Sequence, residues 1–170
     1  MKEEFTMTNT IYQSQVITMK SLKNLFVELT SKCCNQKCKN CYIDIPPYKR
    51  VEDFIDIDLI KEAINDTISE NIECIYLTGA EPMTHPDFNS ILRLCLKKCN
   101  VCIITNASFI NEKKTRFLKH VEEESGHQIL FKLSFSHYNE IKNDNVRSRG
   151  SYRQNMYALK NLDRYDFTNI

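Results

Sequence analysis

Three cysteines stand close together in the stretch Cys34-Asn35-Gln36-Lys37-Cys38-Lys39-Asn40-Cys41-Tyr42, separated by three and then by two residues. The apolar run Leu25-Phe26-Val27-Glu28-Leu29 precedes it and predicts a strand over residues 24–30. A loop after a strand can turn three thiols toward one metal centre, whereas side chains along a strand alternate between its faces. Closely spaced cysteine thiolates hold iron–sulfur clusters. With three thiolates for a four-iron cluster, one iron would stay open to a small molecule, as a catalytic zinc ion keeps an open position.

The order Cys-Asn-x-x-Cys-x-x-Cys-Tyr resembles the cluster loop of the radical S-adenosylmethionine (SAM) superfamily. In that family the open iron binds the amino and carboxylate groups of SAM, and one-electron reduction cleaves SAM to a 5′-deoxyadenosyl radical that takes hydrogen from a substrate. The resemblance implies that Cys34, Cys38 and Cys41 ligate a 4Fe–4S cluster. It also implies that the chain binds SAM and receives its electron from a reductant such as a flavodoxin or ferredoxin.

The loop departs from the family pattern in two places. Asn40 stands where the family usually has an aromatic residue or His, so Tyr42 is the candidate for part of the contact with adenine. Cys33 stands beside Cys34, but it would lengthen the first gap to four residues, so the spacing selects Cys34 as the ligand.

Two other interpretations of the loop were weighed. A secreted disulfide framework is disfavoured because the N-terminal residues lack the apolar run of a signal peptide. A structural zinc site is the main alternative, since Cys33 could join the three proposed ligands to give four thiolates. Adjacent cysteines are poor tetrahedral partners, and zinc sites usually draw two ligand pairs from separate knuckles. The spacing therefore favours the cluster.

A second motif follows the apolar run over residues 72–77, which predicts another strand. The stretch Thr78-Gly79-Ala80-Glu81-Pro82 resembles the Gly-Gly-Glu-Pro motif by which the family binds the amino group of SAM, with Ala80 in place of the second Gly. Gly79 permits close backbone approach, and Glu81 can accept a charge-assisted hydrogen bond from an ammonium group. The alternative is an ordinary turn between a strand and a helix.

The spacing of the cysteine loop recurs at Cys95, Cys99 and Cys102. There the first two cysteines continue the helical spacing of Phe88 and Ile91, and the third begins an apolar run. A free Cys behaves as a small hydrophobic residue, so these three thiols are predicted to fill the core.

Further candidates follow later strands. Thr105-Asn106 comes after the run over residues 101–104 and resembles the Thr-Asn-Gly turn of the family, which makes Asn106 a candidate for SAM binding. In the strand predicted over residues 129–136, Ser134 and Ser136 are candidates for the ribose or carboxylate of SAM, or for simple bonds to backbone. For Arg147 and Arg149 a solvated loop charge is favoured over a contact with the SAM carboxylate.

Helices are predicted between these strands, the first over residues 58–70. His85 is expected to be a turn or capping residue and not a metal ligand. The candidates for helix caps are Asp56 or Asp58, Asn111, Gly126 and Ser151. The inner face of the last helix is predicted to consist of Tyr152, Met156 and Leu159.

The composition suits one domain. The chain has 170 residues, of which 42% are hydrophobic, enough for a sizeable core. A net charge of +1 gives no case for nucleic acid or an anionic membrane, and no apolar run approaches the length of a membrane span. Eight cysteines without a secretion signal indicate a reducing, cytoplasmic setting. Residues 1–20 are expected to form an N-terminal extension, either flexible or adding a short strand.

Strand and helix alternate four times, which predicts an α/β fold with a parallel sheet. All candidate residues then fall at the carboxyl ends of strands, where barrel enzymes keep their active sites. The resemblance implies a partial (β/α) barrel over residues 21–170, with four βα units and the start of a fifth strand near 166–170. Because the family usually has six such units, the chain is expected to be a piece of a longer protein or to complete its sheet with a partner. Besides a radical SAM enzyme and a zinc module, the third possibility is a cluster-bearing protein that binds SAM without turnover.

Overall fold

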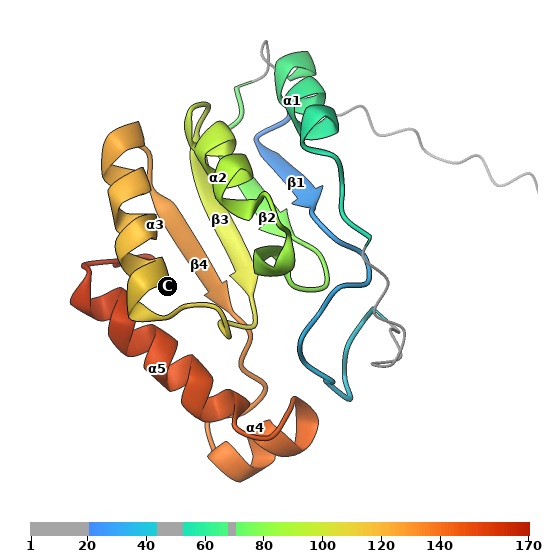
Figure 1. Cartoon of the computed structure of the whole chain (residues 1–170), viewed down its shortest axis with the longest axis vertical. Coiled ribbons are helices and arrows are strands. Elements are labelled where there is room, and N and C mark those ends of the chain that lie inside the picture. The colour runs from blue at the N-terminus through green and yellow to red at the C-terminus, as the bar shows by residue number, and fades with distance from the viewer. Residues whose placement is uncertain (1–20, 44–52, 68–70) are drawn as a thin grey trace, which may run out of the picture.

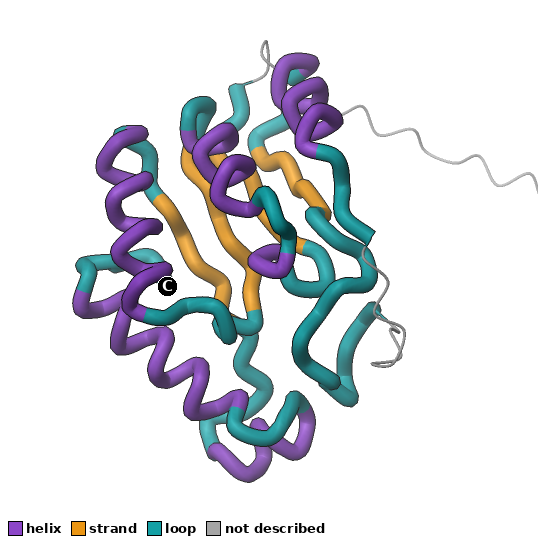
Figure 2. Tube along the Cα trace, in the orientation of Figure 1, coloured by secondary structure: helices purple, strands orange, loops and turns teal. Residues whose placement is uncertain are grey.

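The chain was analysed as a computed structural model, which describes residues 21–43, 53–67 and 71–170. Strands and helices alternate as predicted (Figure 2). In chain order the elements are β1 (Asn24–Glu28), α1 (Ile57–Asp66), β2 (Cys74–Thr78), the 3-10 helix η1 (Pro82–Thr84), α2 (Phe88–Leu96), β3 (Asn100–Thr105), α3 (Glu112–Ser125), β4 (Ile129–Leu133), α4 (Glu140–Val146) and α5 (Ser151–Arg164). The predicted N-terminal extension over 1–20 and the predicted end of the first helix near residue 70 lie outside the described residues.

The four strands form one parallel sheet in the order β1-β2-β3-β4 (Figure 1). Neighbours in the sequence are therefore neighbours in the sheet, as expected when successive βα units are added in one direction. The helices α1, α2 and α3 lie together on one face of the sheet (Figure 1). This arrangement is an α/β partial barrel whose sheet does not close, as predicted.

The core lies between that face and the three helices. One row of paired residues crosses the sheet, from Val27 through Leu77 and Ile103 to Phe131, and every member is buried. The helices contribute the other buried side chains of the core, among them Ile60, Ile64, Phe88, Ile91, Leu92, Leu118 and Val121. Burial of this apolar surface is the main force that holds the layers together.

The opposite face of the sheet is largely uncovered by described residues. Phe26 is 61% exposed and stacks on Tyr76, with 4.4 Å between the ring centroids. In β4, Lys132 points to this face and is exposed, so the strand is covered on its core face only. A hollow of 740 Å³ runs over this face between Tyr76, Phe135 and Ile170.

Several helix ends lie where the sequence predicts them. Asp56 caps α1 by accepting a hydrogen bond from Asp58 N, and Asn111 caps α3 by accepting from Lys114 N. Gly126 ends α3 in the left-handed conformation, with φ of 71°.

The C-terminal part differs from the prediction. Gly150 is the N-cap of α5 and Ser151 is its first residue, so the predicted Ser151 cap is wrong. The predicted inner face is also wrong, since Met156 is 37% exposed, whereas Asn155 and Leu162 are buried. Asn155 can be buried because its side-chain amide donates to Ser134 O.

The last residues run beside β4. Asn169 O accepts a hydrogen bond from Phe131 N at 2.9 Å, where a fifth strand would pair. Within the described ranges, no helix combines the length and apolar character that crossing a bilayer requires.

Candidate functional site

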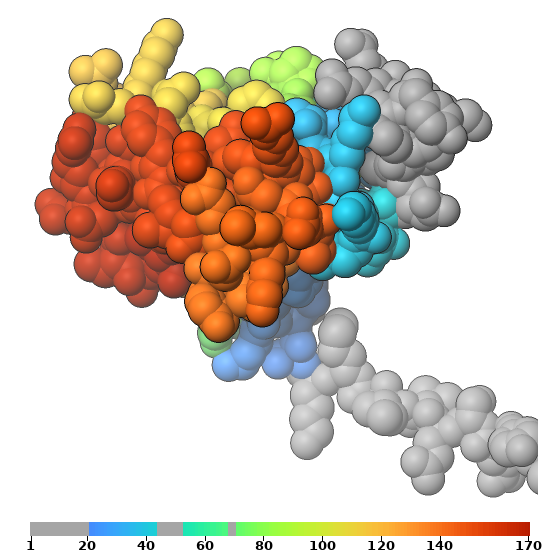
Figure 3. All heavy atoms as spheres, turned by 90° about the horizontal axis from the view of Figure 1, so that it is seen from below, coloured from blue at the N-terminus to red at the C-terminus, as the bar shows by residue number. Residues whose placement is uncertain are grey.

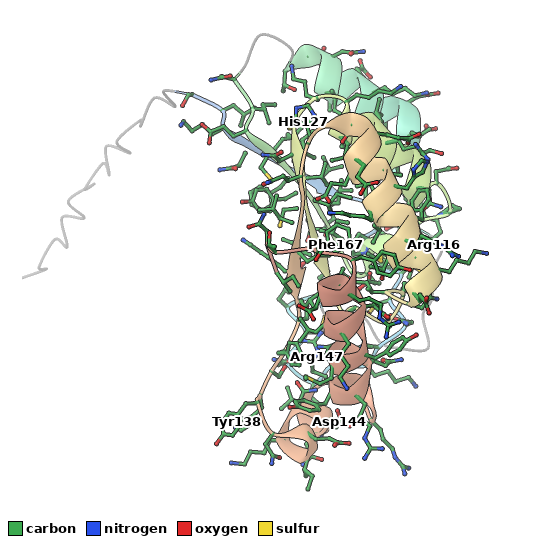
Figure 4. The ribbon with its side chains drawn as sticks, turned by 90° about the vertical axis from the view of Figure 1, so that its left-hand side faces the viewer. Arg116, His127, Tyr138, Asp144, Arg147 and Phe167 are labelled. Carbon is green, nitrogen blue, oxygen red and sulfur yellow. The ribbon has the colours of Figure 1, made fainter. Side chains whose placement is uncertain are left out.

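The candidate residues gather at the carboxyl edge of the sheet, as predicted. Each of the four strands is followed by a loop that carries some of them, and the parallel pairing places all four loops at one edge. Figure 4 shows both ends of the molecule: His127, before β4, lies at one end, and Tyr138 and Asp144, after it, lie toward the other.

One side of the cysteine loop is attached to the turn after β2. Cys33 N donates to Thr30 Oγ1 at 2.9 Å, and Cys33 O accepts from Glu81 N at 3.1 Å and from Thr84 Oγ1 at 3.3 Å. Cys33 is therefore fixed through its backbone. This contact holds the start of the loop against the Gly79-Ala80-Glu81 turn.

The other side of the loop contacts the segment between α4 and α5. Lys39 N donates to Val146 O at 2.7 Å, and Lys37 N donates to Ser148 Oγ at 3.0 Å. In the space-filling view the loop lies directly against this segment (Figure 3). The helix α4 was not predicted. Its N-cap is Asn139, a residue type that favours helix starts, and the side chain accepts from Lys142 N.

The three proposed thiolate ligands differ in exposure: Cys34 and Cys38 are half-buried, and Cys41 is exposed. Burial raises the pKa of Cys34, and the charges of Glu81 and Cys38 raise it further. Burial also raises the pKa of Cys38. The positive charge of Arg147 acts to lower this pKa, and the charge of Cys41 acts to raise it.

The donor set suits an iron–sulfur cluster, because Cys34 Sγ already accepts from Gln36 N at 3.4 Å and from Asn106 Nδ2 at 3.7 Å. Hydrogen bonds of this kind stabilise a thiolate. Across the described part of the chain, no three His, Cys, Asp or Glu side chains converge closely enough to hold a metal ion. Ligation of one cluster by Cys34, Cys38 and Cys41 thus requires their side chains to come closer together than they lie in this structure.

Glu81 is fully buried at the centre of the edge. Its Oε1 accepts from Thr105 Oγ1 at 2.7 Å and from Met83 N at 3.2 Å, and its Oε2 accepts from Asn106 N at 2.8 Å. Burial raises the pKa of Glu81, and these three hydrogen bonds act in the opposite direction. The carboxylate therefore connects the end of β2 to the end of β3.

Gly79 occupies a position that only glycine fits. Its φ is 120°, and a Cβ built there would lie 2.3 Å from Thr30 O. Ala80 N donates to the same Thr30 O at 2.8 Å, so the close approach is between the turn and the cysteine loop. Ala80 is not among the non-glycine residues with positive φ, so its methyl group is tolerated.

The other predicted SAM contacts lie at the same edge. Asn106 is buried, and Ser134 and Ser136 are half-buried. Ser134 N donates to Thr105 O, and Ser136 N donates to Asn143 Oδ1. Tyr42 is 81% exposed.

The two arginines have different surroundings. Arg149 is exposed, as expected for a solvated loop charge. Arg147 is half-buried, and its charge lowers the pKa of Cys38 and of Glu81. Its Nε is buried without a hydrogen-bond partner among the described residues. The solvated interpretation of Arg147 is therefore wrong.

The residues judged unlikely to bind metal are engaged elsewhere. His85 ends η1, its Nε2 contacts Ile55 O at 2.8 Å and its Nδ1 accepts from Asp87 N at 3.0 Å, which confirms a turn residue. Cys95, Cys99 and Cys102 are buried, as predicted for core side chains.

A sequence model of the Radical SAM superfamily matches residues 29–170. The chain belongs to the radical SAM superfamily. It is 28% identical over 137 residues to the antilisterial bacteriocin subtilosin biosynthesis protein AlbA of Bacillus subtilis (strain 168), covering 79% of this chain and 29% of AlbA.

Solved structures show the same fold. Native anSMEcpe with bound AdoMet aligns with a TM-score of 0.67 and 17% identity, over 84% of this chain and 41% of that one. Streptococcus suis SuiB bound to the precursor peptide SuiA aligns with a TM-score of 0.70 and 16% identity, over 86% of this chain and 31% of SuiB. This radical SAM chain thus spans well under half the length of the relatives it matches.

Proposed function

We propose that this chain is the SAM-cleaving core of a radical SAM enzyme, with a 4Fe–4S cluster on Cys34, Cys38 and Cys41. The observation that carries the proposal is the joining of the cysteine loop to the turn after β2, through the hydrogen bonds of Thr30 and Cys33. When bound, the cluster supplies the electron that cleaves SAM. The reductant is a small electron carrier such as a flavodoxin or ferredoxin, and the setting is cytoplasmic.

The protein would orient SAM with groups at the carboxyl edge. Gly79, Ala80 and Glu81 form the turn beside the cysteine loop, which supports the proposal that they seat the methionyl part of SAM. Asn106, Ser134 and Ser136 follow the next strands and are proposed for its remaining polar groups, with Tyr42 for part of the adenine.

A peptide is the substrate class that we propose. AlbA is described as a protein of bacteriocin biosynthesis, and SuiB has been solved bound to a precursor peptide. The uncovered face of the sheet offers room for such a substrate, because the 740 Å³ hollow reaches from Tyr76 to Phe135 near the carboxyl edge.

The test is formation of 5′-deoxyadenosine. The chain is reconstituted anaerobically with iron and sulfide, reduced with dithionite and incubated with SAM, and the products are separated by chromatography. We expect 5′-deoxyadenosine from the wild type and none from Cys38→Ala. A protein that holds the cluster and SAM but releases no 5′-deoxyadenosine would be a binding protein, and the enzymatic proposal would be wrong.

A further inference from the structure

We infer that Asn106 is a positioning residue that donates a hydrogen bond to the Cys34 ligand of the cluster, and that the buried Glu81 carboxylate holds Asn106 in place. The inference rests on the proposed function, because it assigns a task to residues around the proposed cluster. It gives Glu81 a structural connection to the cluster loop instead of a direct bond to the SAM ammonium group.

The first step is the orientation of the Asn106 side chain. Its Oδ1 accepts from Ser108 N at 3.0 Å, and a backbone N–H can only donate. The Nδ2 end must therefore face the cysteine loop, where it donates to Asn35 Oδ1 at 2.9 Å and to Cys34 Sγ at 3.7 Å. All polar atoms of this amide are in use, so the side chain has one defined position.

The second step is a further hydrogen bond that attaches the cysteine loop to the turn after β3. Asn35 Nδ2 donates to Ser108 Oγ at 2.7 Å, which gives a second bond between the cysteine loop and the turn after β3. Cys34 and Asn35 are thus both fixed to the segment from Asn106 to Ser108. Hydrogen bonds around a metal ligand orient it and tune the metal.

The third step is the role of Glu81. Its Oε2 accepts from Asn106 N, and its Oε1 accepts from Thr105 Oγ1, which in turn accepts from Ala107 N at 3.0 Å. The turn after β3 is thus built on this one carboxylate. Ala107 has a φ of 64°, a conformation that a non-glycine residue keeps only where its surroundings enforce it.

The chemistry of Glu81 supports this role over a direct contact with SAM. The side chain is fully buried, and three donors of the protein already point at its two oxygens. Because no part of Glu81 is exposed, an ammonium group of SAM has no direct access to the carboxylate in this structure. Glutamine has nearly the same shape, but its NH₂ group would face one of these donors, so Glu81→Gln is the sharpest variant for this residue.

The experiment measures the midpoint potential of the reconstituted cluster by an EPR-monitored redox titration, together with iron content. Hydrogen bonds to cluster sulfurs are among the factors that set the potential, and a donor stabilises the more negative, reduced state. We expect Asn106→Ala to shift the potential to lower values at equal iron occupancy. Glu81→Gln should shift it in the same direction.

Asn161→Ala is the matched control, because Asn161 is as buried as Asn106, with 4% of its surface exposed, and lies in α5. We expect its potential to equal that of the wild type. If Asn106→Ala does not fold, Asn106→Asp takes its place, since it keeps the acceptor for Ser108 N and loses both donors. The added carboxylate also lowers the potential, so an unchanged potential in this variant overturns the inference all the more firmly.

The outcomes separate the two proposals. A wild-type chain that takes up no cluster contradicts the proposed function before any variant is compared. A wild-type cluster whose potential is unchanged in Asn106→Ala or Asn106→Asp at full iron content overturns this inference alone. An unchanged potential in Glu81→Gln, with SAM binding weakened at least tenfold, would show that Glu81 binds SAM directly.

Discussion

At the scale of single residues, Gly79 shows how closely the two motifs are built together. The glycine was expected to let backbone approach a ligand, and the structure shows that it approaches Thr30 at the start of the cysteine loop. A residue with a side chain would push the turn away from the loop, so the glycine is needed before any cofactor is considered.

We predict that Gly79→Ala destabilises the fold far more than Gly126→Ala. Both positions have positive φ, but only the first would bring a Cβ within 2.3 Å of a backbone oxygen, while nothing lies within 4 Å at Gly126. We expect a loss of about 3 kcal/mol or more for Gly79→Ala, from the clash added to backbone strain, and about 1 kcal/mol for the control. Urea unfolding measures both, and equal losses would contradict the proposed contact with Thr30.

At the scale of elements, one cysteine spacing has two outcomes. After β1 it lies in a loop, where Cys34 and Cys38 are half-buried and Cys41 is exposed. The second set of cysteines is buried: Cys95 lies in α2, Cys99 in the connection after it and Cys102 in β3. The element that carries a motif decides what its residues can bind.

Burial also lowers the reactivity of cysteines within the strands and helices. Cys74, at the start of β2, allows this effect to be measured. Burial raises its pKa to about 11, from an ordinary value of 9.0. At pH 8 about one thiol in a thousand is then a thiolate, against about one in ten for an ordinary thiol.

We therefore predict that iodoacetamide labels Cys74 at pH 8 about 100-fold more slowly than a free cysteine in the same solution. Because the pKa is raised, the rate should increase about tenfold for each pH unit between 8 and 10. Mass spectrometry of peptides from the native protein gives the rate. A rate that does not change with pH would show that access, and not ionisation, limits the reaction.

At the scale of the whole molecule, the site exists because four loops meet at one edge of a parallel sheet. That meeting could be predicted from the sequence, since the apolar runs and caps such as Asp56, Asn111 and Gly126 are local signals. The cysteine loop and the turn at Gly79 could be placed at the same edge for the same reason.

Other parts of the site depend on contacts that no local pattern records. The bond between Glu81 and Asn106 joins residues that are far apart in the sequence. The helix α4 is short, and its one buried side chain is the polar Asn143, which accepts from Ser136 N, so apolar periodicity cannot reveal it. The inner face of α5 was missed because its buried Asn155 also looks like a surface residue.

Iron and acid-labile sulfide analysis of the anaerobically reconstituted chain tests the central claim most directly, with Cys34→Ala, Cys33→Ala and Cys95→Ala measured beside the wild type. We predict about four irons per chain, with brown colour, in the wild type, Cys33→Ala and Cys95→Ala. Cys33 is held through its backbone, which the substitution keeps, and Cys95 is a core residue. Cys34→Ala should lose the cluster while keeping its fold. A colourless wild-type protein that holds one zinc ion, or equal iron loss in Cys34→Ala and Cys95→Ala, would contradict the account.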